Sequence, residues 1–283
     1  MSQLHHLRYW ALLLLIALNF FVWVVVASSH RDLTVSFLNV GQGDAILIES
    51  PSGTEVLIDG GRDRSVLREL PKRLGPLDRS IDLVIATHPD ADHIGGLPGV
   101  FKQYRVERFM EPGVQSDTNP SQALAAAVRA EENIATMQAR RGLRLHLGEG
   151  AYADILFPDR EVPLLETNTG SIVVRVVYGA TSFLLSGDSP RAIEEWLVRL
   201  DEERLHSDVL KAGHHGSRTS TSEAWLAAVD PSFVVISAGK DNSYGHPHQE
   251  VLERIAASGA IIVSTIDEGT ITFSSNGVEI RKH

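Results

Sequence analysis

The sequence contains no cysteine. This absence excludes disulfides, zinc ribbons and cysteine nucleophiles, so any catalytic metal must be bound by histidine and carboxylate side chains. Basic residues are scarce relative to acidic ones, because 26 Lys and Arg stand against 36 Asp and Glu, for a net charge of −10. The bulk charge therefore lacks the broad basic surface that binds duplex nucleic acid, although a local patch or a metal could still bind phosphate.

The 283 residues are 43% hydrophobic and 22% charged, which is the composition of an ordinary globular protein. Disorder, collagen-like repeats and a polytopic membrane protein do not fit that composition. No linker, short repeat or low-complexity tract follows residue 33. We therefore expect one large domain over residues 33–283, preceded by a separate segment over residues 1–32.

The amino-terminal segment predicts a membrane anchor. Residues 10–27 form an apolar run in which Asn19 is the only polar residue, and a helix of that length spans roughly 27 Å, close to a bilayer core. Arg8 and the terminal amine precede the run, which favours a cytoplasmic amino terminus and a domain outside the cytoplasm. The alternative is a secretory signal cleaved after residues 25–27, which also exports the domain. A buried core helix is disfavoured by the position of the run.

Apolar runs broken by Gly, Pro or Ser predict strands at residues 33–38, 45–48, 55–58, 81–86, 171–177, 182–186, 208–212 and 233–237. Helical spacing and capping residues predict helices at residues 63–74, 121–141, 190–205, 222–229 and 248–258. Each half of the chain begins with strands and continues with helices. This order predicts two sheets stacked face to face with helices outside, which is a four-layer α/β sandwich of the αββα type.

Four candidate metal ligands fall within a short loop after the strand predicted at 81–86. They are His88, Asp90, Asp92 and His93, and two glycines follow them. A loop with this spacing can turn its imidazoles and carboxylates toward a common centre, which two metal ions could share. Asp90 or Asp92 could instead cap the helix that begins near Ile94, but a cap does not account for both histidines.

Further ligands are expected at strand ends in the second half of the chain. Asp188 follows one predicted strand and could bridge two cations, or else cap the next helix. His214 and His215 follow the next predicted strand, and either could complete the site. His246 belongs to a third histidine cluster and is a candidate phosphate contact or general acid, or else a turn histidine.

Six short runs carry a family resemblance when they are read in order. They are Leu38–Ala45, Asp59–Gly61, Thr87–Gly96, Ser186–Asp188, His214–Ser217 and Tyr244–His248. Together they resemble the metallo-β-lactamase superfamily, and more narrowly the hydrolase domain of ComEC-type DNA-uptake competence proteins. The resemblance covers about residues 33–283. It implies the αββα sandwich, with a metal cleft at the edge where the two sheets meet.

The resemblance also implies roles for the matched residues. The implied ligands are His88 and Asp90 for one metal, Asp92 and His93 for the other, Asp188 as the bridge, and His214, or its close rival His215, as the remaining imidazole. Asp59 would orient the histidine loop, and Asp44 and Gln42 would line the cleft.

Two departures from the superfamily pattern affect the first metal. Superfamily members usually have histidine where Asp90 stands. They also have a histidine shortly before the bridging aspartate, whereas residues 167–171 contain none. The first position is therefore rich in oxygen ligands, which favours Mn²⁺ alongside or instead of Zn²⁺, and a centre with a single ion is an alternative to two.

The expected chemistry is hydrolysis by a metal-bound hydroxide, with Asp92 and Asp188 in the catalytic centre. Lys211 and His246 are candidates for neutralising a phosphate or protonating a leaving oxygen. The resemblance implies a phosphodiesterase or nuclease that acts on single-stranded DNA or another phosphodiester and is linked to DNA uptake. No multi-helix channel segment accompanies the domain in this sequence, so such a role would require a separate pore.

Two other functions fit the same residues. One is an extracytoplasmic hydrolase of a small ester, phosphoester or lactam, which the negative net charge slightly favours. The other is a non-catalytic anchored binding module whose depleted ligands no longer hold a metal. A positive groove around the centre would support the nuclease, and a narrow apolar pocket would support the small-molecule enzyme.

Overall fold

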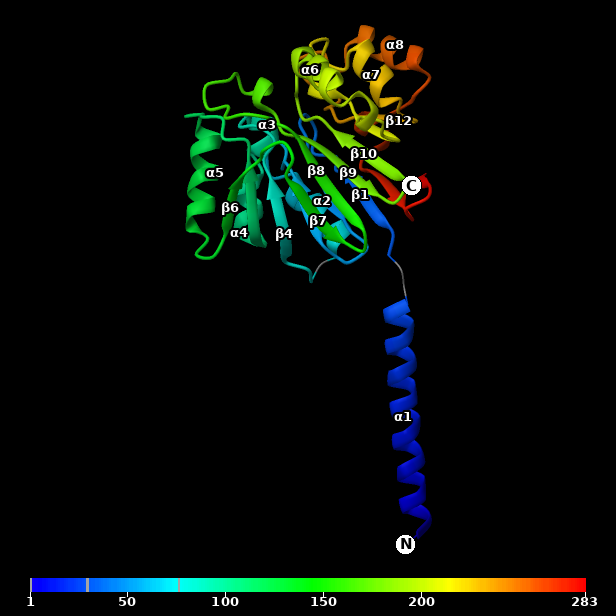
Figure 1. Cartoon of the computed structure of the whole chain (residues 1–283). Coiled ribbons are helices and arrows are strands. Elements are labelled where there is room, and N and C mark those ends of the chain that lie inside the picture. The colour runs from blue at the N-terminus through cyan, green and yellow to red at the C-terminus, as the bar shows by residue number, and fades with distance from the viewer. Residues whose placement is uncertain (1, 29–30, 76) are drawn as a thin grey trace. The chain divides into compact units, whose positions relative to one another are not determined.

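The computed structural model describes residues 2–28, 31–75 and 77–283 (Figure 1). The chain divides into two compact units, residues 1–31 and residues 32–283.

The first unit is the helix α1 (Ser2–Ser28), of which the side chains of residues 6 and 8–21 are described. Its large apolar side chains, among them Trp10 and Phe20, are exposed. Within the described part of the chain, no helix has the length and apolar character needed to cross a membrane. The anchor predicted at residues 10–27 is therefore not confirmed. The side chains of residues 22–27, including the alternative cleavage point, lie outside those described.

The second unit is built on two β-sheets. Over the described residues the first sheet has eight strands, in the spatial order β15 (Ile280–Lys282), β14 (Ile271–Ser275), β1 (Leu33–Phe37), β2 (Ile46–Glu49), β3 (Glu55–Ile58), β4 (Ser80–Ile85), β5 (Arg105–Glu111) and β6 (Ala135–Gln138). The second sheet has seven, in the order β13 (Ile261–Ser264), β12 (Phe233–Ile236), β11 (Val209–Lys211), β10 (Thr181–Leu185), β9 (Val173–Tyr178), β8 (Ala151–Phe157) and β7 (Arg144–Gly148).

Helices connect the strands within each half of this unit. The α-helices are α2 (Val66–Leu74), α3 (Ala91–Ile94), α4 (Leu97–Gln103), α5 (Asn119–Ala130), α6 (Arg191–Asp201), α7 (Glu223–Val229), α8 (Gln249–Ser258) and α9 (Thr265–Glu268). Short 3₁₀ turns are η1 (Asn168–Gly170), η2 (Glu202–Arg204) and η3 (Gly213–Gly216).

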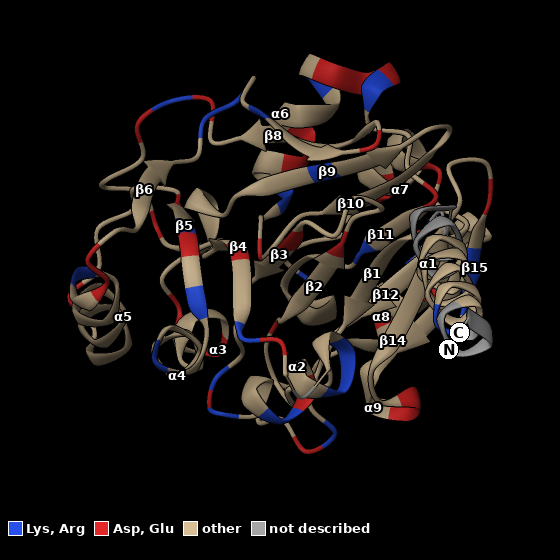
Figure 2. Ribbon diagram, turned by 90° about the horizontal axis from the view of Figure 1, so that it is seen from below, with Lys and Arg blue, Asp and Glu red and all other residues tan. Residues whose placement is uncertain are grey.

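Three apolar clusters fill the spaces between the layers. The central cluster joins the facing sides of the two sheets, where Phe183 of β10 meets Phe273 of β14 edge to face with ring centroids 6.3 Å apart. A second cluster packs α2, α4 and α5 on the outer side of the first sheet. A third packs α6, α7 and α8 on the outer side of the second sheet. The helices therefore lie outside both sheets (Figures 1 and 2), which is the predicted αββα arrangement.

One predicted helix is wrong over half of its length. The alanine-rich segment 121–141 leaves the helix α5 at Ala130 and then forms the strand β6. Thr136 of β6 pairs with Phe109 of β5, and the side chain of Met137 packs against the central cluster. Helix propensity is a weak preference, and here the added strand pairing and burial override it.

The topology brings the polar loops to one edge of each sheet. β3, β4 and β5 run parallel in the first sheet, and β10, β11 and β12 run parallel in the second. Loops that follow the carboxyl ends of parallel strands open at the same edge of a sheet, where ligands commonly bind. The predicted metal ligands follow β4, β10 and β11. The fold thus positions residues that are distant in the sequence for one shared site.

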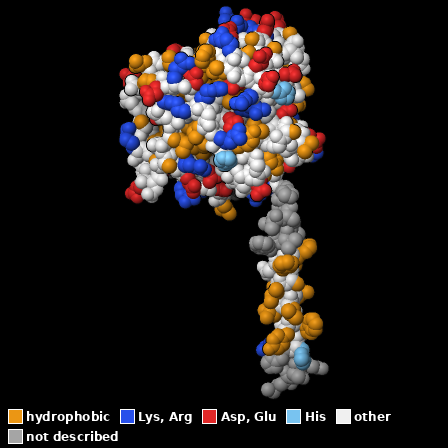
Figure 3. All heavy atoms as spheres, in the orientation of Figure 1, with side chains coloured by type: hydrophobic (Ala, Val, Ile, Leu, Met, Phe, Trp, Pro, Cys, Tyr) orange, Lys and Arg blue, Asp and Glu red, His pale blue; other side chains and the backbone are white. Residues whose placement is uncertain are grey.

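The outer face of β7, β8 and β9 is less covered by helices than the rest of the second sheet. Its outward side chains include Arg144, Tyr152, Asp154 and Arg175, which are exposed or half-exposed. Figure 3 shows basic side chains gathered over these strands.

Candidate metal centre

The centre is built around the carboxylate of Asp188, in the loop after β10. Its Oδ2 lies 3.3 Å from His93 Nε2 and 3.4 Å from His215 Nε2. The Nε2 atoms of His214 and His88 lie 3.8 and 3.9 Å from the same oxygen. Imidazoles from both halves of the domain therefore direct one ring nitrogen each toward a single buried carboxylate.

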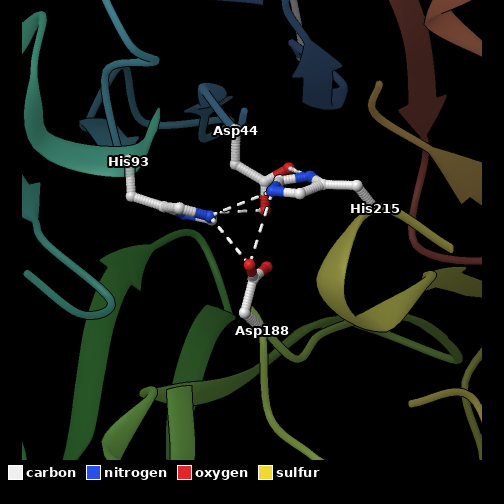
Figure 4. A group of neighbouring side chains, drawn as sticks. All are labelled: Asp44, His93, Asp188 and His215. Carbon is white, nitrogen blue, oxygen red and sulfur yellow. Dashed lines mark hydrogen bonds and ion pairs between the residues drawn. The ribbon is translucent and has the colours of Figure 1, made fainter. Parts of the chain in front are cut away.

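Four side chains form the tightest group of candidate ligands (Figure 4). Asp44, His93, Asp188 and His215 are all buried, and their ligand atoms lie within 4.8 Å of one another. They come from the β1–β2 loop, α3, the loop after β10 and η3. Two carboxylates and two imidazoles are suitable ligands for a divalent metal such as zinc or manganese. The group could therefore hold a metal ion.

The two histidines of this group are held through their other ring nitrogen. His93 Nδ1 lies 2.7 Å from Asp59 Oδ2, and the Asp59 carboxylate also accepts hydrogen bonds from the backbone N–H and hydroxyl of Thr87. His215 Nδ1 donates to the carbonyl oxygen of Ser237 at 2.9 Å. Because an acceptor faces each Nδ1, the ring proton is fixed there and Nε2 is directed to the centre, as in known metal sites.

The carboxylates make this position attractive to a cation. Burial alone would lower the pKa of His93, but Asp188 and Asp59 raise that pKa well above its ordinary value. Burial also opposes the charge on Asp188, yet His215 and His93 hold the pKa of Asp188 well below its ordinary value. A divalent ion would replace the protons that these imidazoles otherwise bind.

His88 fits a metal ligand for a different reason. Its side chain is fully buried, and its Nε2 has no hydrogen-bond partner among the described residues. Burial and the neighbouring His93 hold the pKa of His88 well below its ordinary value, so the ring is neutral. A buried polar atom without a partner costs about 1–3 kcal/mol, and a metal ion at this nitrogen would remove that cost.

Lys211 lies inside the centre. Its side chain is fully buried, and Nζ lies 2.5 Å from Asp44 Oδ2, 3.0 Å from the carbonyl oxygen of Gly187 and 3.4 Å from Asp188 Oδ1. Burial would raise the pKa of Asp44, but Lys211 helps to bring it down to about 2. These three acceptors match the three N–H groups of an ammonium, so none is left for a substrate. The geometry therefore does not favour the predicted phosphate contact.

Both aspartates of the histidine loop reach the centre. Asp92 Oδ2 lies 3.4 Å from His215 Nε2, and Asp90 Oδ2 lies 3.7 Å from His88 Nε2. Asp90 stands at the amino-terminal cap of α3, but its side chain makes no capping hydrogen bond. The cap of α6 is Pro190, so the aspartate after β10 is not a helix cap either. The capping alternatives are therefore not supported.

The structure distinguishes the two neighbouring histidines of η3. His215 is buried within the tight group, whereas the His214 side chain is 27% exposed and its Nε2 is farther from Asp188. This geometry favours His215 as the ligand, in contrast to the order expected from the resemblance. His246 meets His214 edge to face, with ring centroids 5.4 Å apart, and burial lowers the pKa of His246 to about 4.

Asp44 is the residue whose role the sequence reasoning missed, because it was expected only to line the cleft. Gly43 has φ of 126°, and a Cβ at that residue would lie 2.0 Å from the carbonyl oxygen of Asp92, so only glycine fits there. Gln42 accepts a hydrogen bond from Gly239 N at 3.1 Å, which ties this loop to the second half of the domain. The acidic residue that ends the sequence Gly41-Gln42-Gly43-Asp44 was the available signal.

A family model for the metallo-β-lactamase superfamily matches residues 38–240. The chain belongs to this superfamily. The predicted family and the predicted class, a metallo-hydrolase of this superfamily, are thereby confirmed.

The curated relatives that this chain matches are much longer proteins. The chain is 31% identical to ComE operon protein 3 of Bacillus subtilis (strain 168) over 257 residues, which cover 84% of this chain and 32% of the relative. It is 30% identical to competence protein ComA of Neisseria gonorrhoeae, over 94% of this chain and 36% of that protein. The chain thus spans about a third of the length of these curated relatives.

Among solved structures, CmlA, a diiron β-hydroxylase from Streptomyces venezuelae, has a similar fold. The TM-score is 0.59 at 15% identity, over 88% of this chain and 55% of that one. At this identity the likeness concerns the fold alone.

The departures from the superfamily pattern lie on one side of the centre. The segment 167–171, which lacks the histidine expected from the resemblance, contains η1 and is followed by Ile172, whose N–H donates to the carbonyl oxygen of Thr87 just before β9 begins. Asn168 Oδ1 and Ser171 Oγ are buried there without hydrogen-bond partners among the described residues. Oxygen atoms rather than a ring nitrogen are therefore available on this side.

Proposed function

We propose that this superfamily member is a metal-dependent phosphodiesterase that cleaves single-stranded DNA. The observation that carries the proposal is the convergence of four imidazole Nε2 atoms within 3.9 Å of one Asp188 oxygen. Buried imidazoles and carboxylates with perturbed pKa values that converge at a sheet edge are typical of a catalytic metal centre.

The ligands divide between two positions of unequal strength. His93, His215 and Asp188 of the tight group would hold one ion together with Asp92. Asp44, the fourth member of that group, would stay paired with Lys211. His88 and Asp90 would join Asp188 at the second position. The second position is weaker, because the Asp90 side chain is 38% exposed and the usual histidine is absent. When bound, the metal lowers the pKa of a coordinated water and stabilises negative charge on the reacting phosphate. Zn²⁺ or Mn²⁺ suits these ligands.

Other residues of the chain preorganise the centre and its rim. Lys211 balances part of the charge of Asp44 and Asp188, which allows these carboxylates to be buried together. His246 lies beside His214 and its Nδ1 has no hydrogen-bond partner among the described residues. Its low pKa keeps the ring neutral, so His246 can donate one hydrogen bond to a phosphate oxygen.

The choice of DNA rests on the relatives, two of which are named ComE operon protein 3 and competence protein ComA. DNA taken up by a cell arrives outside the cytoplasm. The proposal therefore includes an anchor at residues 10–27 with the domain on the outer side of the membrane. The apolar run and the preceding Arg8 support that topology.

The proposal is tested by the hydrolysis of single-stranded DNA and of bis-p-nitrophenyl phosphate with Mn²⁺ or Zn²⁺, beside an Asp188→Ala control. We expect metal-dependent cleavage of both substrates that is lost in the control. Cleavage of the small diester alone would replace the nuclease with a small-molecule phosphoesterase. The absence of both activities, with no metal bound, would leave the anchored binding module.

A second candidate function, hydrolysis of a small ester, phosphoester or lactam, is favoured by a cavity beside the centre. The cavity has a volume of about 410 Å³ and is lined by His88 and Pro89 together with apolar residues such as Phe109 and Leu124 of β5 and α5. A pocket of this size and character suits a small organic ligand. If this candidate is correct, bis-p-nitrophenyl phosphate or an added small carboxylic ester is hydrolysed under the same conditions and DNA is not.

A further inference from the structure

A groove of about 750 Å³ lies on the outer face of β8 and β9, away from the metal ligands. Four arginines line it, and three carboxylates accompany them. The residues alternate along β8, so Ala153 and Ile155 face the core while Tyr152 and Asp154 face the groove. Figure 3 shows basic side chains across this face. The groove is therefore a local basic surface on a chain whose net charge is −10.

Two of the arginines are neutralised by partners within the groove. Arg141 makes two hydrogen bonds of 2.6 Å to Asp201, and Arg144 makes bonds of 2.6 and 2.7 Å to Asp154. Bidentate pairs of this kind leave little charge for a ligand. Any anion would therefore interact mainly with the other two arginines.

Arg175 and Arg204 have no ion pair among the described residues. The half-buried Arg175 side chain donates to the carbonyl oxygen of His206 at 2.8 Å and to Ser182 Oγ at 3.1 Å, which fixes its guanidinium in the groove. Its Nη1 group has no acceptor within the described chain. A fixed guanidinium with spare donors and no carboxylate partner is suited to a phosphate group.

Arg175 also belongs to a row that crosses three strands. Arg144 pairs with Asp154, and Asp154 pairs with Arg175, so the three side chains are neighbours on one face. The guanidinium of Arg144 lies over the ring of Tyr152, 3.8 Å from its centroid. Single-stranded nucleic acids bind to surfaces that combine basic groups with aromatic and guanidinium planes on which bases stack.

A second groove provides the internal comparison. It has a volume of about 740 Å³ and lies beside β5 of the other sheet. Arg105 and the half-buried Arg108 line it, but three glutamates, Glu107, Glu131 and Glu132, outnumber them. The groove over β8 and β9 therefore differs in charge from this groove of similar size on the other sheet.

We propose that the groove over β8 and β9 binds the phosphate backbone of single-stranded DNA on its way to the metal centre. This inference rests on the proposed function. Arg175 pairs with Leu184 of β10, and Asp188 follows four residues later, which is at most about 13 Å of extended chain. A bound strand can therefore contact the groove and the centre at the same time.

The experiment measures the binding of a fluorescent single-stranded oligonucleotide to the purified full chain by anisotropy, in EDTA so that no cleavage occurs. Arg175→Met is expected to weaken binding about 5-fold to 10-fold and to reduce the slope of log affinity against log salt by about 0.7. Arg204→Gln, an exposed substitution that leaves the fold intact, is expected to weaken binding about 3-fold. Arg108→Met, in the comparison groove, is the matched control and should bind like the wild type.

Equal binding by the wild type and both groove variants would overturn the inference, as would equal weakening by Arg108→Met. Binding of duplex DNA as tightly as single strands would overturn the assignment to single strands. Cleavage is measured separately. If DNA is cleaved normally but its binding does not depend on Arg175, the proposed role of the groove is wrong and the proposed nuclease activity stands. If binding depends on Arg175 but DNA is not cleaved, the proposed nuclease activity is wrong and the proposed role of the groove stands.

Discussion

Acidic residues gather near both ends of strands β3 and β4, but among the described residues only the cluster near the carboxyl ends contacts imidazoles and a lysine. Near the carboxyl ends, Asp59 and, from the loop after β10 of the other sheet, Asp188 contact imidazoles, and Asp44 of the β1–β2 loop contacts Lys211. At the amino ends, the acidic residues are Glu49, Glu55, Asp78 and Asp82. Burial and then the charges of the other three raise the pKa of Glu55 to about 7.

The difference shows that cationic partners outweigh burial for Asp188 and Asp44, whereas burial still raises the pKa of Asp59 although His93 faces it. Burial opposes ionisation at both ends. At the carboxyl ends, His215, His93 and Lys211 overcome it and keep Asp188 ionised. At the amino ends, no such effect offsets it, and Glu55 binds a proton near neutral pH. The carboxyl ends are therefore preorganised for a cation, and the amino ends are not.

The largest expected effect is a difference in metal affinity between variants of the two adjacent histidines of η3. His215→Ala should lower the affinity for Zn²⁺ by more than about 100-fold, because it removes a buried Nε2 from the tight group. His214→Ala should lower it by less than about 5-fold, because its side chain is partly exposed. Competition with a chromophoric chelator measures both affinities. The reverse order would restore the assignment implied by the family resemblance.

Asp59→Asn tests the hydrogen bond that orients the ligand His93. The new amide N–H can face His93 Nδ1, which would move the ring proton to Nε2 and block the ligand atom. We expect the metal affinity to fall about 10-fold to 100-fold with little change in secondary structure. Asp82→Asn, at the opposite end of β4, is the matched control and should bind metal normally. Similar losses in both variants would show that the two ends are not distinct.

Lys211→Met removes the cation between two buried carboxylates. Because one partner of a buried ion pair is lost, the metal-free chain should be destabilised by about 3–5 kcal/mol, with a Tm lower by about 10 °C. A saturating divalent metal should raise the Tm of the variant more than that of the wild type, since it restores positive charge. Thermal unfolding with and without Mn²⁺ measures this. An equal gain in both proteins would exclude the charge-balancing role.

The smallest expected effect is a change in Tm on substitution of Glu55, at the amino end of β3. The pKa of Glu55 rises from 4.5 to about 7 on folding, so ionised Glu55 destabilises the folded state, and stability is lost as the pH rises through this range. Glu55→Gln should raise the Tm by about 1–2 °C at pH 8, after allowance for partial exposure, and should change it little at pH 4.5. Calorimetry at the two pH values measures the difference. A lower Tm at pH 8 would contradict this view of the cluster.

The sequence predicted the parts of the site that are contiguous. A continuous apolar strand followed by His88 to His93 indicates both a buried strand and a polar turn, and local pattern suffices for that prediction. The layers followed from the order of strands and helices. The segment 121–141 was misassigned because its alanines favour a helix, whereas strand pairing with β5 decides the outcome.

The choice between neighbours could not be predicted. His214 and His215 have the same residue type and almost the same position in sequence. Which of the two directs its ring into the centre depends on the left-handed backbone of both residues, with φ of 49° and 54°, and on the hydrogen bond from His215 to the carbonyl group of Ser237. The burial of Lys211 could not be predicted from the sequence either, because a lysine at a strand end usually reaches solvent. Its partner Asp44 is also distant in the sequence.

We propose Asp188 as the shared carboxylate of a divalent metal centre. The most direct test is equilibrium dialysis of the full chain and of Asp188→Asn against Zn²⁺ or Mn²⁺, with elemental analysis and circular dichroism. We predict one tightly bound ion per wild-type chain and a loss of affinity of more than about 100-fold in the folded variant. A wild-type chain that binds no stoichiometric metal, or a variant that binds as tightly as the wild type, would contradict the claim.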